Sequence, residues 1–284
     1  MYSVTARIAM VKQPRGGYLK PSLLHVCELK DEKTLREEEN VHATIVGLTV
    51  DYLTRYMMGV DKKEAFRISC YGAMIANIIG GRPGAQKEAE NYLSAINGID
   101  DASIISACKL ATFDVWKRNV AVAALAKDAD NTRPDENTIQ IMVIRSLKFW
   151  NEYGPIVKDG FTFEQNGYSK MVSSGDGDYL TSDTLWDFKV SKAKPNSKHT
   201  LQLLMYWIMG QHSGKKEFKK IDKIGIFNPR LNTVYTYEMK DIPPETIREI
   251  ETADASGDGI HLNMTYSKYW ADHICRTVAA VLRP

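Results

Sequence analysis

The sequence predicts an α/β (α+β) protein in which helices flank a mixed central β-sheet, with a helical insertion or subdomain in the N-terminal half. Two observations predict this class. Between about residues 37 and 150, apolar residues recur at spacings of three and four, which is typical of helices. After Gly154-Pro155 the period changes to two, which is typical of strands. The later elements follow the order strand, strand, strand, helix, strand, strand, which favours a mixed sheet covered by helices.

The N-terminal half is expected to be irregular at first and then helical. Residues 1 to about 35 are mixed, and a basic turn at 12–18 is expected to separate two short extended pieces. The helical spacing that follows is clearest in three runs, at 45–57, 68–78 and 104–115. Asp135 is placed to cap a further helix that runs through Trp150.

The C-terminal half supplies the predicted sheet. We expect strands at 161–164, 172–180, 184–191, 223–227 and 233–239. We expect helices at 199–212, 243–253 and 265–282. These elements indicate a single domain over 1–284, with a core at 155–240 and a helical elaboration at 60–150.

The composition of the 284 residues excludes several classes of protein. Hydrophobic residues make up 44% and charged residues 25%, which is typical of a folded globular chain. There is no apolar run of about 18 residues for a membrane-spanning helix, and the N-terminal residues do not resemble a secretory signal. The 4 cysteines are scattered without a CxxC pair, which argues against a disulfide scaffold, a zinc site or an iron–sulfur cluster. We expect a cytoplasmic protein with no membrane partner.

The charge is balanced in total, at +2, but it is unevenly distributed. The segment 189–223 contains nine lysines and two acids, a net of +7. Such a segment would attract a polyanion, because phosphate contacts dominate the affinity of proteins for nucleic acids. A solvated lysine-rich helix face is the alternative interpretation.

The strongest chemical signal lies between Gly175 and Lys189. A hairpin that turns at Ser182-Asp183 would place Asp178 opposite Asp187 and Asp176 opposite Lys189. Directly opposed side chains have Cβ atoms roughly 4.5–5.5 Å apart, and like charges at that distance are destabilising. The two carboxylates therefore require a counter-ion, a shared proton or a break in the strand register.

Strand alternation predicts two different faces for this hairpin. Lys189 shares a face with Asp187, while Trp186 and Phe188 point to the other face and can pack under a helix. A hard divalent cation suits the acidic face, because Mg²⁺ takes oxygen ligands and often binds phosphates as well. Lys189 could then position a water molecule or stabilise developing charge. A surface hairpin with solvated acids and a lysine salt bridge is the alternative.

The order of these residues resembles the PD-(D/E)XK nucleases, and most closely their RecB and lambda-exonuclease branch. The resemblance consists of a Gly-x-x-Asp strand, Asp-x-Lys on the partner strand, and a helix with Gln-x-x-x-Tyr. The matching residues are Gly175, Asp178, Asp187, Lys189, Gln202 and Tyr206. The resemblance covers about 160–240 and implies a restriction-endonuclease-like fold, with 155–240 as the catalytic core.

The resemblance also implies roles for individual residues. Asp178 and Asp187 would bind Mg²⁺ (or Mn²⁺) together with the carbonyl of Phe188. Lys189 would be the catalytic lysine, and Gln202 and Tyr206 would lie near the DNA and the metal-bound water. Gln202 and Tyr206 are four residues apart, so they share one face of a helix.

Members of this branch often carry a further metal ligand on an upstream helix, commonly a histidine four residues after a glycine. In this chain Asp51 has that spacing from Gly47. Aspartate binds Mg²⁺ well, but Asp51 is also placed to pair with Arg55 one helical turn later. Glu39 is a less favoured candidate.

The leading functional hypothesis is a Mg²⁺-dependent deoxyribonuclease, an exonuclease by its resemblance, acting in DNA repair, recombination or phage-related metabolism. Lys192, Lys194, Lys198 and His199 are the expected DNA-binding residues of the basic segment. One alternative is a catalytically silent nucleic-acid-binding or assembly subunit of the same fold, and another is an RNA nuclease with the same chemistry. A homo-oligomer or a recombination protein is a conceivable partner.

Overall fold

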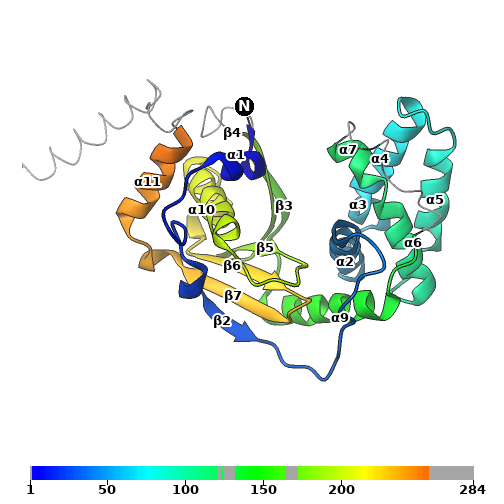
Figure 1. The fold of residues 1–284 in the computed structure, drawn as a ribbon, viewed down its shortest axis with the longest axis horizontal. Helices are drawn as coiled ribbons and strands as arrows, with labels where there is room; N and C mark the ends of the chain where they lie inside the picture. The colour runs from blue at the N-terminus through cyan, green and yellow to red at the C-terminus, as the bar shows by residue number, and fades with distance from the viewer. Residues whose placement is uncertain (1, 120–122, 124–131, 164–171, 256–284) are drawn as a thin grey trace, which may run out of the picture.

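A computed structural model describes residues 2–119, 123, 132–163 and 172–255 of the chain, and the helix expected at 265–282 lies outside these residues. Within the described part, seven strands form one mixed sheet (Figure 1). The strands are β1 (Tyr2–Ser3), β2 (His25–Glu28), β3 (Lys158–Phe163), β4 (Val172–Leu180), β5 (Thr184–Phe188), β6 (Lys223–Asn228) and β7 (Thr233–Glu238).

The strand order is β1-β4-β5-β6-β7-β2, with β3 paired to β4 outside that path. The pairs β1–β4 and β5–β6 are parallel, while β3–β4, β4–β5, β6–β7 and β2–β7 are antiparallel. The parallel pair β5–β6 is possible because a helix crosses between the two strands. The prediction of a mixed sheet flanked by helices is therefore confirmed.

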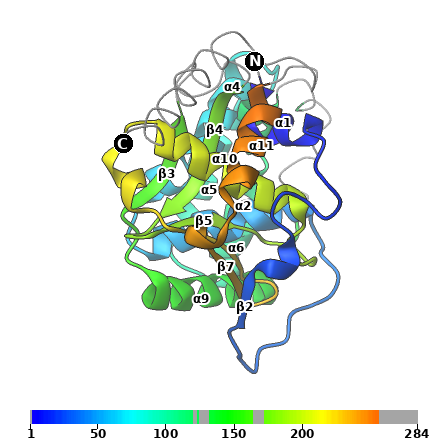
Figure 2. The same cartoon turned by 90° about the vertical axis from the view of Figure 1, so that its left-hand side faces the viewer.

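One face of the sheet is covered by α1 (Val4–Met10), α10 (Ser197–His212) and α11 (Pro244–Ala255), as Figure 2 shows. Apolar residues of β4, β5 and β6 face this side, and a row of α10 side chains packs on them to form a buried core. That core includes Leu180, Leu185, Ile224, Ile226, Leu201, Leu204, Met205 and Ile208. Burial of this α10 stripe fixes which side of the helix faces the sheet.

The N-terminal segment differs from the prediction. Residues 4–10 form the helix α1, where an extended piece was expected. Ser3 caps the helix by accepting a hydrogen bond from the Ala6 amide, and Val4 and Ile8, one turn apart, are buried against the sheet. Packing of these two side chains on the sheet stabilises the helix, although the local sequence pattern for a helix is weak. The short 3₁₀ helices lie at Pro21–Leu23, Lys216–Lys220 and Met239–Asp241.

The opposite face of the sheet is covered by α9 (Glu136–Tyr153), which is capped by Asp135 as predicted. The C-terminal half of α9 places Phe149 and Trp150 against an aromatic layer from the strands. Phe149 stacks on Phe227 with ring centroids 4.1 Å apart and meets Trp186 edge-on at 5.0 Å. This aromatic layer lies directly behind the strand that carries Asp187.

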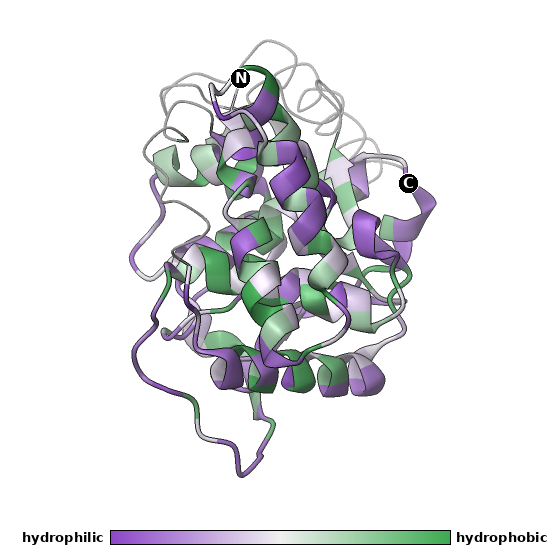
Figure 3. Cartoon of the chain, turned by 90° about the vertical axis from the view of Figure 1, so that its right-hand side faces the viewer, coloured by the Kyte–Doolittle hydropathy of each residue, from purple (hydrophilic) through white to green (hydrophobic). Residues whose placement is uncertain are grey.

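The N-terminal half of α9 packs into a second core, which belongs to a helical block at residues 43–118. The block contains α2 (Ala43–Met57), α3 (Lys62–Ala65), α4 (Arg67–Ile78), α5 (Ala85–Ala95), α6 (Asp101–Ala111) and α7 (Asp114–Arg118). Seen from the side of the block, these helices carry both hydrophilic and hydrophobic residues (Figure 3). Because α9 contributes to both cores, it joins the helical block to the sheet.

The predicted strand at 184–191 ends earlier, at Phe188. Beyond that residue the chain leaves the sheet, because the side chain of Val190 packs against the core of the helical block. Among the described residues, no helix is both long and apolar enough to span a membrane.

Candidate functional site

The hairpin β4–β5 has the register that its turn predicts. Tyr179 pairs with Trp186 and Leu180 with Leu185, so the next position along the strands is Asp178 facing Asp187. There the pairing changes, because the Asp178 carboxylate itself accepts a hydrogen bond of 2.8 Å from the Phe188 amide. A side chain thus takes the place of a main-chain acceptor where the two acids meet.

Asp187 is the buried member of the acid pair, with 3% of its surface exposed. Its Oδ1 accepts a 2.8 Å hydrogen bond from the Lys189 ammonium group. Its Oδ2 is buried and has no hydrogen-bond partner among the described residues. A buried carboxylate oxygen without a donor is costly, so this position suits an additional positively charged group.

Burial and the nearby Asp187 carboxylate raise the pKa of Asp178 to about 7. The two carboxylates therefore repel each other as expected of opposed acids, because only one of them is readily ionised when both are desolvated. Burial opposes the charged form of Lys189, but Asp187 and Asp178 outweigh it and raise the pKa of the lysine. Lys189 is thus a permanent cation beside the two acids.

The helix α10 brings its two polar residues to the same place. The Tyr206 hydroxyl donates a 2.8 Å hydrogen bond to the Asp176 carbonyl and accepts one of 3.3 Å from the Gln202 amide. Burial raises the pKa of Tyr206, as do the carboxylates nearby, so the hydroxyl stays neutral. Gln202 and Tyr206 therefore lie on one face of α10, directed at the strand that carries the acids.

Gly175 allows this close approach of helix and strand. A Cβ atom at this position would lie 3.0 Å from Cε1 of Tyr206 and 2.8 Å from Cγ2 of Val4. Both distances are shorter than ordinary contacts, so any larger residue would push the helix away. This gives a physical reason for the glycine three residues before Asp178.

Phe188 takes part through its main chain and packs through its ring. The ring lies against Tyr179 and Phe227 on the α9 side of the sheet, as predicted from alternation. Its amide is bonded to Asp178, so the main chain of Phe188 is held beside the acid pair. The Phe188 carbonyl lies on the main chain between Asp187 and Lys189 and is therefore held near the acid pair as well.

Asp51 lies on α2, and the structure shows the ion pair that was the alternative interpretation for it. It pairs with Arg55 one turn later, with Nε 3.2 Å from each carboxylate oxygen, and it also accepts a hydrogen bond from the Tyr179 hydroxyl. Asp51 also lies near the acid pair, and its charge helps to raise the pKa of Asp178. Arg55 holds Asp51 from one side and contacts Asp159 of β3 on the other.

The other upstream candidate, Glu39, lies elsewhere. It pairs with Arg230 and lines a different hollow of about 660 Å³, which also includes Lys192. The structure therefore places Asp51, and not Glu39, beside Asp178.

The predicted DNA-binding residues divide into two groups. Lys192, Lys194 and Lys198 are exposed, in the segment before α10 and in its first turn, and Lys192 contacts the Glu37 carbonyl. The His199 ring caps α10 by accepting a 3.2 Å hydrogen bond from the Asn196 amide. Burial lowers the pKa of His199, and the nearby charge of Lys189 lowers it further, which favours the neutral imidazole.

A pocket of about 490 Å³ lies between the helical block and the strands β3 and β4. Its wall contains Asp51, Glu64, Asp159, Asp176 and Asp178, together with five cationic residues. These cations are Arg55, Arg67, Arg118, Lys158 and Lys215. They come from separate parts of the chain, so no local spacing could have identified them as a group.

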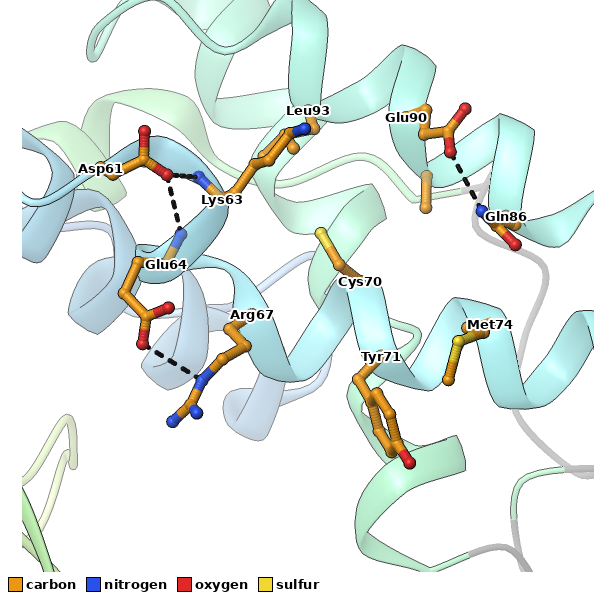
Figure 4. Close-up of a pocket in the computed structure, with 11 residues that line it drawn as sticks. Asp61, Lys63, Glu64, Arg67, Cys70, Tyr71, Met74, Gln86, Glu90 and Leu93 are labelled. Atoms are coloured by element: carbon orange, nitrogen blue, oxygen red, sulfur yellow. Dashed lines mark hydrogen bonds and ion pairs between the residues drawn. The ribbon is translucent and has the colours of Figure 1, made fainter.

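A further hollow of about 490 Å³ lies on the helical block between α4 and α5 (Figure 4). Its polar residues pair with one another, as in the contacts of Glu64 with Arg67 and of Gln86 with Glu90. Arg67 lines this hollow as well as the pocket beside Asp178, but its side chain is 69% exposed. We assign no chemistry to the hollow between α4 and α5.

Comparison of the chain with protein-family models, with curated proteins and with solved structures finds no match. Within the part of the chain that the structure describes, no three His, Cys, Asp or Glu residues form a ready-made metal cluster. Any functional assignment therefore depends on the chemistry of the residues gathered around Asp178 and Asp187.

Proposed function

We propose that this chain is a Mg²⁺-dependent nuclease with the restriction-endonuclease-like fold of the PD-(D/E)XK superfamily. The observation that carries the proposal is the convergence of Asp178, Asp187 and Lys189, with one buried carboxylate oxygen lacking a partner. Gln202 and Tyr206 reach the same strand from α10. The convergence of these residues from two strands and one helix supports the resemblance seen in their order along the chain.

The donor set fits a hard divalent cation. Asp178, Asp187 and the Phe188 carbonyl would supply oxygen ligands, and Mg²⁺ commonly uses one or two carboxylates and keeps several waters. The partnerless Oδ2 of Asp187 and the raised pKa of Asp178 both indicate that this pair favours added positive charge. Asp51 would act near the ion without leaving Arg55 and Tyr179. When bound, such an ion lowers the pKa of a water molecule and polarises a phosphate oxygen.

The residues of the chain would act around that ion. Lys189, which is held at Asp187 and remains charged, would stabilise the charge that develops on the phosphate in the transition state. The Tyr206 hydroxyl and the Gln202 amide would orient polar groups beside the acids. The aromatic layer behind β5 would keep Asp187 in a fixed, water-poor position.

The preference for an exodeoxyribonuclease rests on the branch that the motif order resembles. The test is to incubate purified protein with end-labelled linear DNA and with closed circular DNA, in Mg²⁺ or in Mn²⁺. We expect loss of linear DNA while circles persist. Equal cutting of both forms would reject the exonuclease while keeping the nuclease. The same assay with an RNA strand distinguishes an RNA nuclease.

A catalytically silent DNA-binding subunit is a second candidate. It is favoured by the ion pair of Lys189 with Asp187, which already neutralises one acid, and by the lack of a three-residue metal cluster in the described residues. No cleavage with either metal, together with salt-sensitive binding, would favour this subunit over the enzyme.

A further inference from the structure

The pocket beside Asp178 is lined by both acidic and cationic side chains. Asp159 of β3 and Asp176 and Asp178 of β4 line it on the sheet side, and Asp51 and Glu64 line it on the side of the helical block. A phosphodiester carries a negative charge, so these acids alone would repel a DNA strand. A strand can reach Asp178 only if cations around the pocket offset this repulsion.

Arg118 is such a cation, and its position is fixed by a contact with the buried carboxylate of Asp114. Its Nε lies 3.2 Å from the carboxylate of Asp114, which is only 2% exposed. Asp114 also accepts hydrogen bonds from the hydroxyl of Tyr52, at 2.6 Å, and from that of Ser69. The buried carboxylate thereby ties α7 to α2 and α4, while 55% of the Arg118 side chain remains exposed.

Lys158 of β3 and Lys215, which follows α10, line the same pocket as Arg118. The Nζ of Lys158 lies 2.5 Å from Glu217, which is outside the pocket lining. The Nζ of Lys215 donates a 3.0 Å hydrogen bond to the Thr162 carbonyl. Each of these cations is thus held by another residue, and none of the three is paired with Asp178.

We propose that Arg118, Lys158 and Lys215 form a phosphate clamp that holds the backbone of a DNA strand across the pocket, next to Asp178. Asp114 is the positioning residue for Arg118, because it fixes the direction of the guanidinium group. The choice of DNA as the ligand rests on the proposed function. The clamp differs from the exposed lysines 192, 194 and 198, which do not line this pocket.

Binding of a fluorescently labelled single-stranded oligodeoxynucleotide, measured by anisotropy in EDTA, tests the clamp without catalysis. The variants are Arg118→Ala, Lys158→Ala and Lys215→Ala. The matched controls are Lys117→Ala, the neighbouring residue on α7 that lies over the Tyr71 ring, and Lys240→Ala, an exposed lysine outside the basic segment 189–223. All are compared with the wild type between 50 and 300 mM salt, after their melting temperatures have been measured.

We expect each clamp variant to weaken binding about three- to tenfold at 100 mM salt. We also expect each to flatten the dependence of log Kd on log salt, by about 0.7 for every phosphate that the variant no longer neutralises. The controls should change affinity less than twofold. Because Arg118→Ala could loosen α7, Lys215→Ala provides the independent measurement.

The outcomes separate the clamp from the nuclease. Clamp variants that bind like Lys117→Ala and Lys240→Ala, with an unchanged salt slope, overturn the clamp even if the wild type cleaves DNA. Clamp variants that bind more weakly, in a protein that cleaves DNA with neither Mg²⁺ nor Mn²⁺, support the clamp and reject the nuclease. A wild-type protein that does not bind the oligonucleotide at any salt concentration overturns the clamp.

Discussion

The two walls of the pocket beside Asp178 are built in different ways. On the sheet side, Asp178, Asp187 and Lys189 lie within twelve residues of each other, and a single hairpin brings them together. Of these three residues, Asp178 lines the pocket. On the helical wall, Arg118 reaches the pocket only because Asp114 ties α7 to Tyr52 and Ser69 of two other helices. The comparison teaches that a reacting centre can be local in sequence while the surface that would bind its substrate depends on the whole fold.

The largest expected effect concerns the acid pair of the hairpin. Asp187→Asn keeps the shape of the side chain but removes the charge of the buried carboxylate. Under the proposed function, we expect the cleavage rate to fall by about 10³-fold, equivalent to about 4 kcal/mol of transition-state stabilisation. The measurement is the single-turnover rate on end-labelled linear DNA in Mg²⁺.

Asp183→Asn is the matched control for this substitution. Asp183 lies in the turn of the same hairpin and pairs with Lys223 at 3.0 Å, and its side chain is 45% exposed. We expect its rate to stay within about twofold of the wild type. Equal losses in both variants would show that the hairpin, and not the acid at 187, determines activity.

The second effect tests how the two walls are joined. Phe149→Ala removes a fully buried ring that stacks on Phe227 and meets Trp186. We expect a loss of about 3–5 kcal/mol in the free energy of unfolding. The measurement is urea unfolding followed by far-UV circular dichroism. A cost below about 1 kcal/mol would mean that the aromatic layer does not hold α9 on the sheet.

The parts of the fold that the sequence predicted depend on local patterns. The alternation of Leu185, Trp186 and Asp187, together with the turn at 182–183, is enough to predict the register and both faces of the hairpin. The helix 136–153 was predictable because Asp135 caps it and its apolar spacing is regular.

Other features depend on contacts that no local pattern contains. The helix at 4–10 forms because two apolar residues are buried on a distant sheet, and β5 ends early because Val190 packs on the helical block. The Arg118–Asp114 contact matters only because α7 lies against α2 and α4. The spacing of Asp51 and Arg55 predicted their ion pair, but not the contact with Tyr179 that brings Asp51 to the acids.

The third effect sharpens the description of the acid pair. The pKa of Asp178 is raised from 3.8 to about 7, so the folded protein holds a proton in this range that the unfolded chain has released. The unfolding free energy of the metal-free protein should therefore fall as pH rises from about 4 to about 7. Asp178→Asn removes this titration and supplies an amide that can donate to Asp187.

We expect Asp178→Asn to be more stable than the wild type in EDTA at pH 8, by on the order of 2 kcal/mol, and to lose this advantage near pH 4. The same variant should abolish the rise in melting temperature that Mg²⁺ gives the wild type. Melting curves at both pH values, with EDTA and with Mg²⁺, measure both effects. A stability difference that is equal at the two pH values would contradict the raised pKa.

The smallest effect concerns the contact of α10 with the sheet wall. Tyr206→Phe removes the hydroxyl that donates to the Asp176 carbonyl and accepts from Gln202. We expect a loss of about 1 kcal/mol in stability, since a partly buried main-chain hydrogen bond is lost. Under the proposed function, the cleavage rate should also fall, by up to about tenfold, because Gln202 is no longer oriented.

Tyr237→Phe separates these two consequences. The Tyr237 hydroxyl also donates to a main-chain carbonyl, that of Asp241 at 2.9 Å, but at an exposed position on β7. We expect this control to leave the cleavage rate unchanged and to cost less than about 0.5 kcal/mol. Tyr206→Phe and Tyr237→Phe with the same rate would restrict Tyr206 to a packing role, whereas a lower rate in Tyr206→Phe alone would place its hydroxyl in the reacting centre.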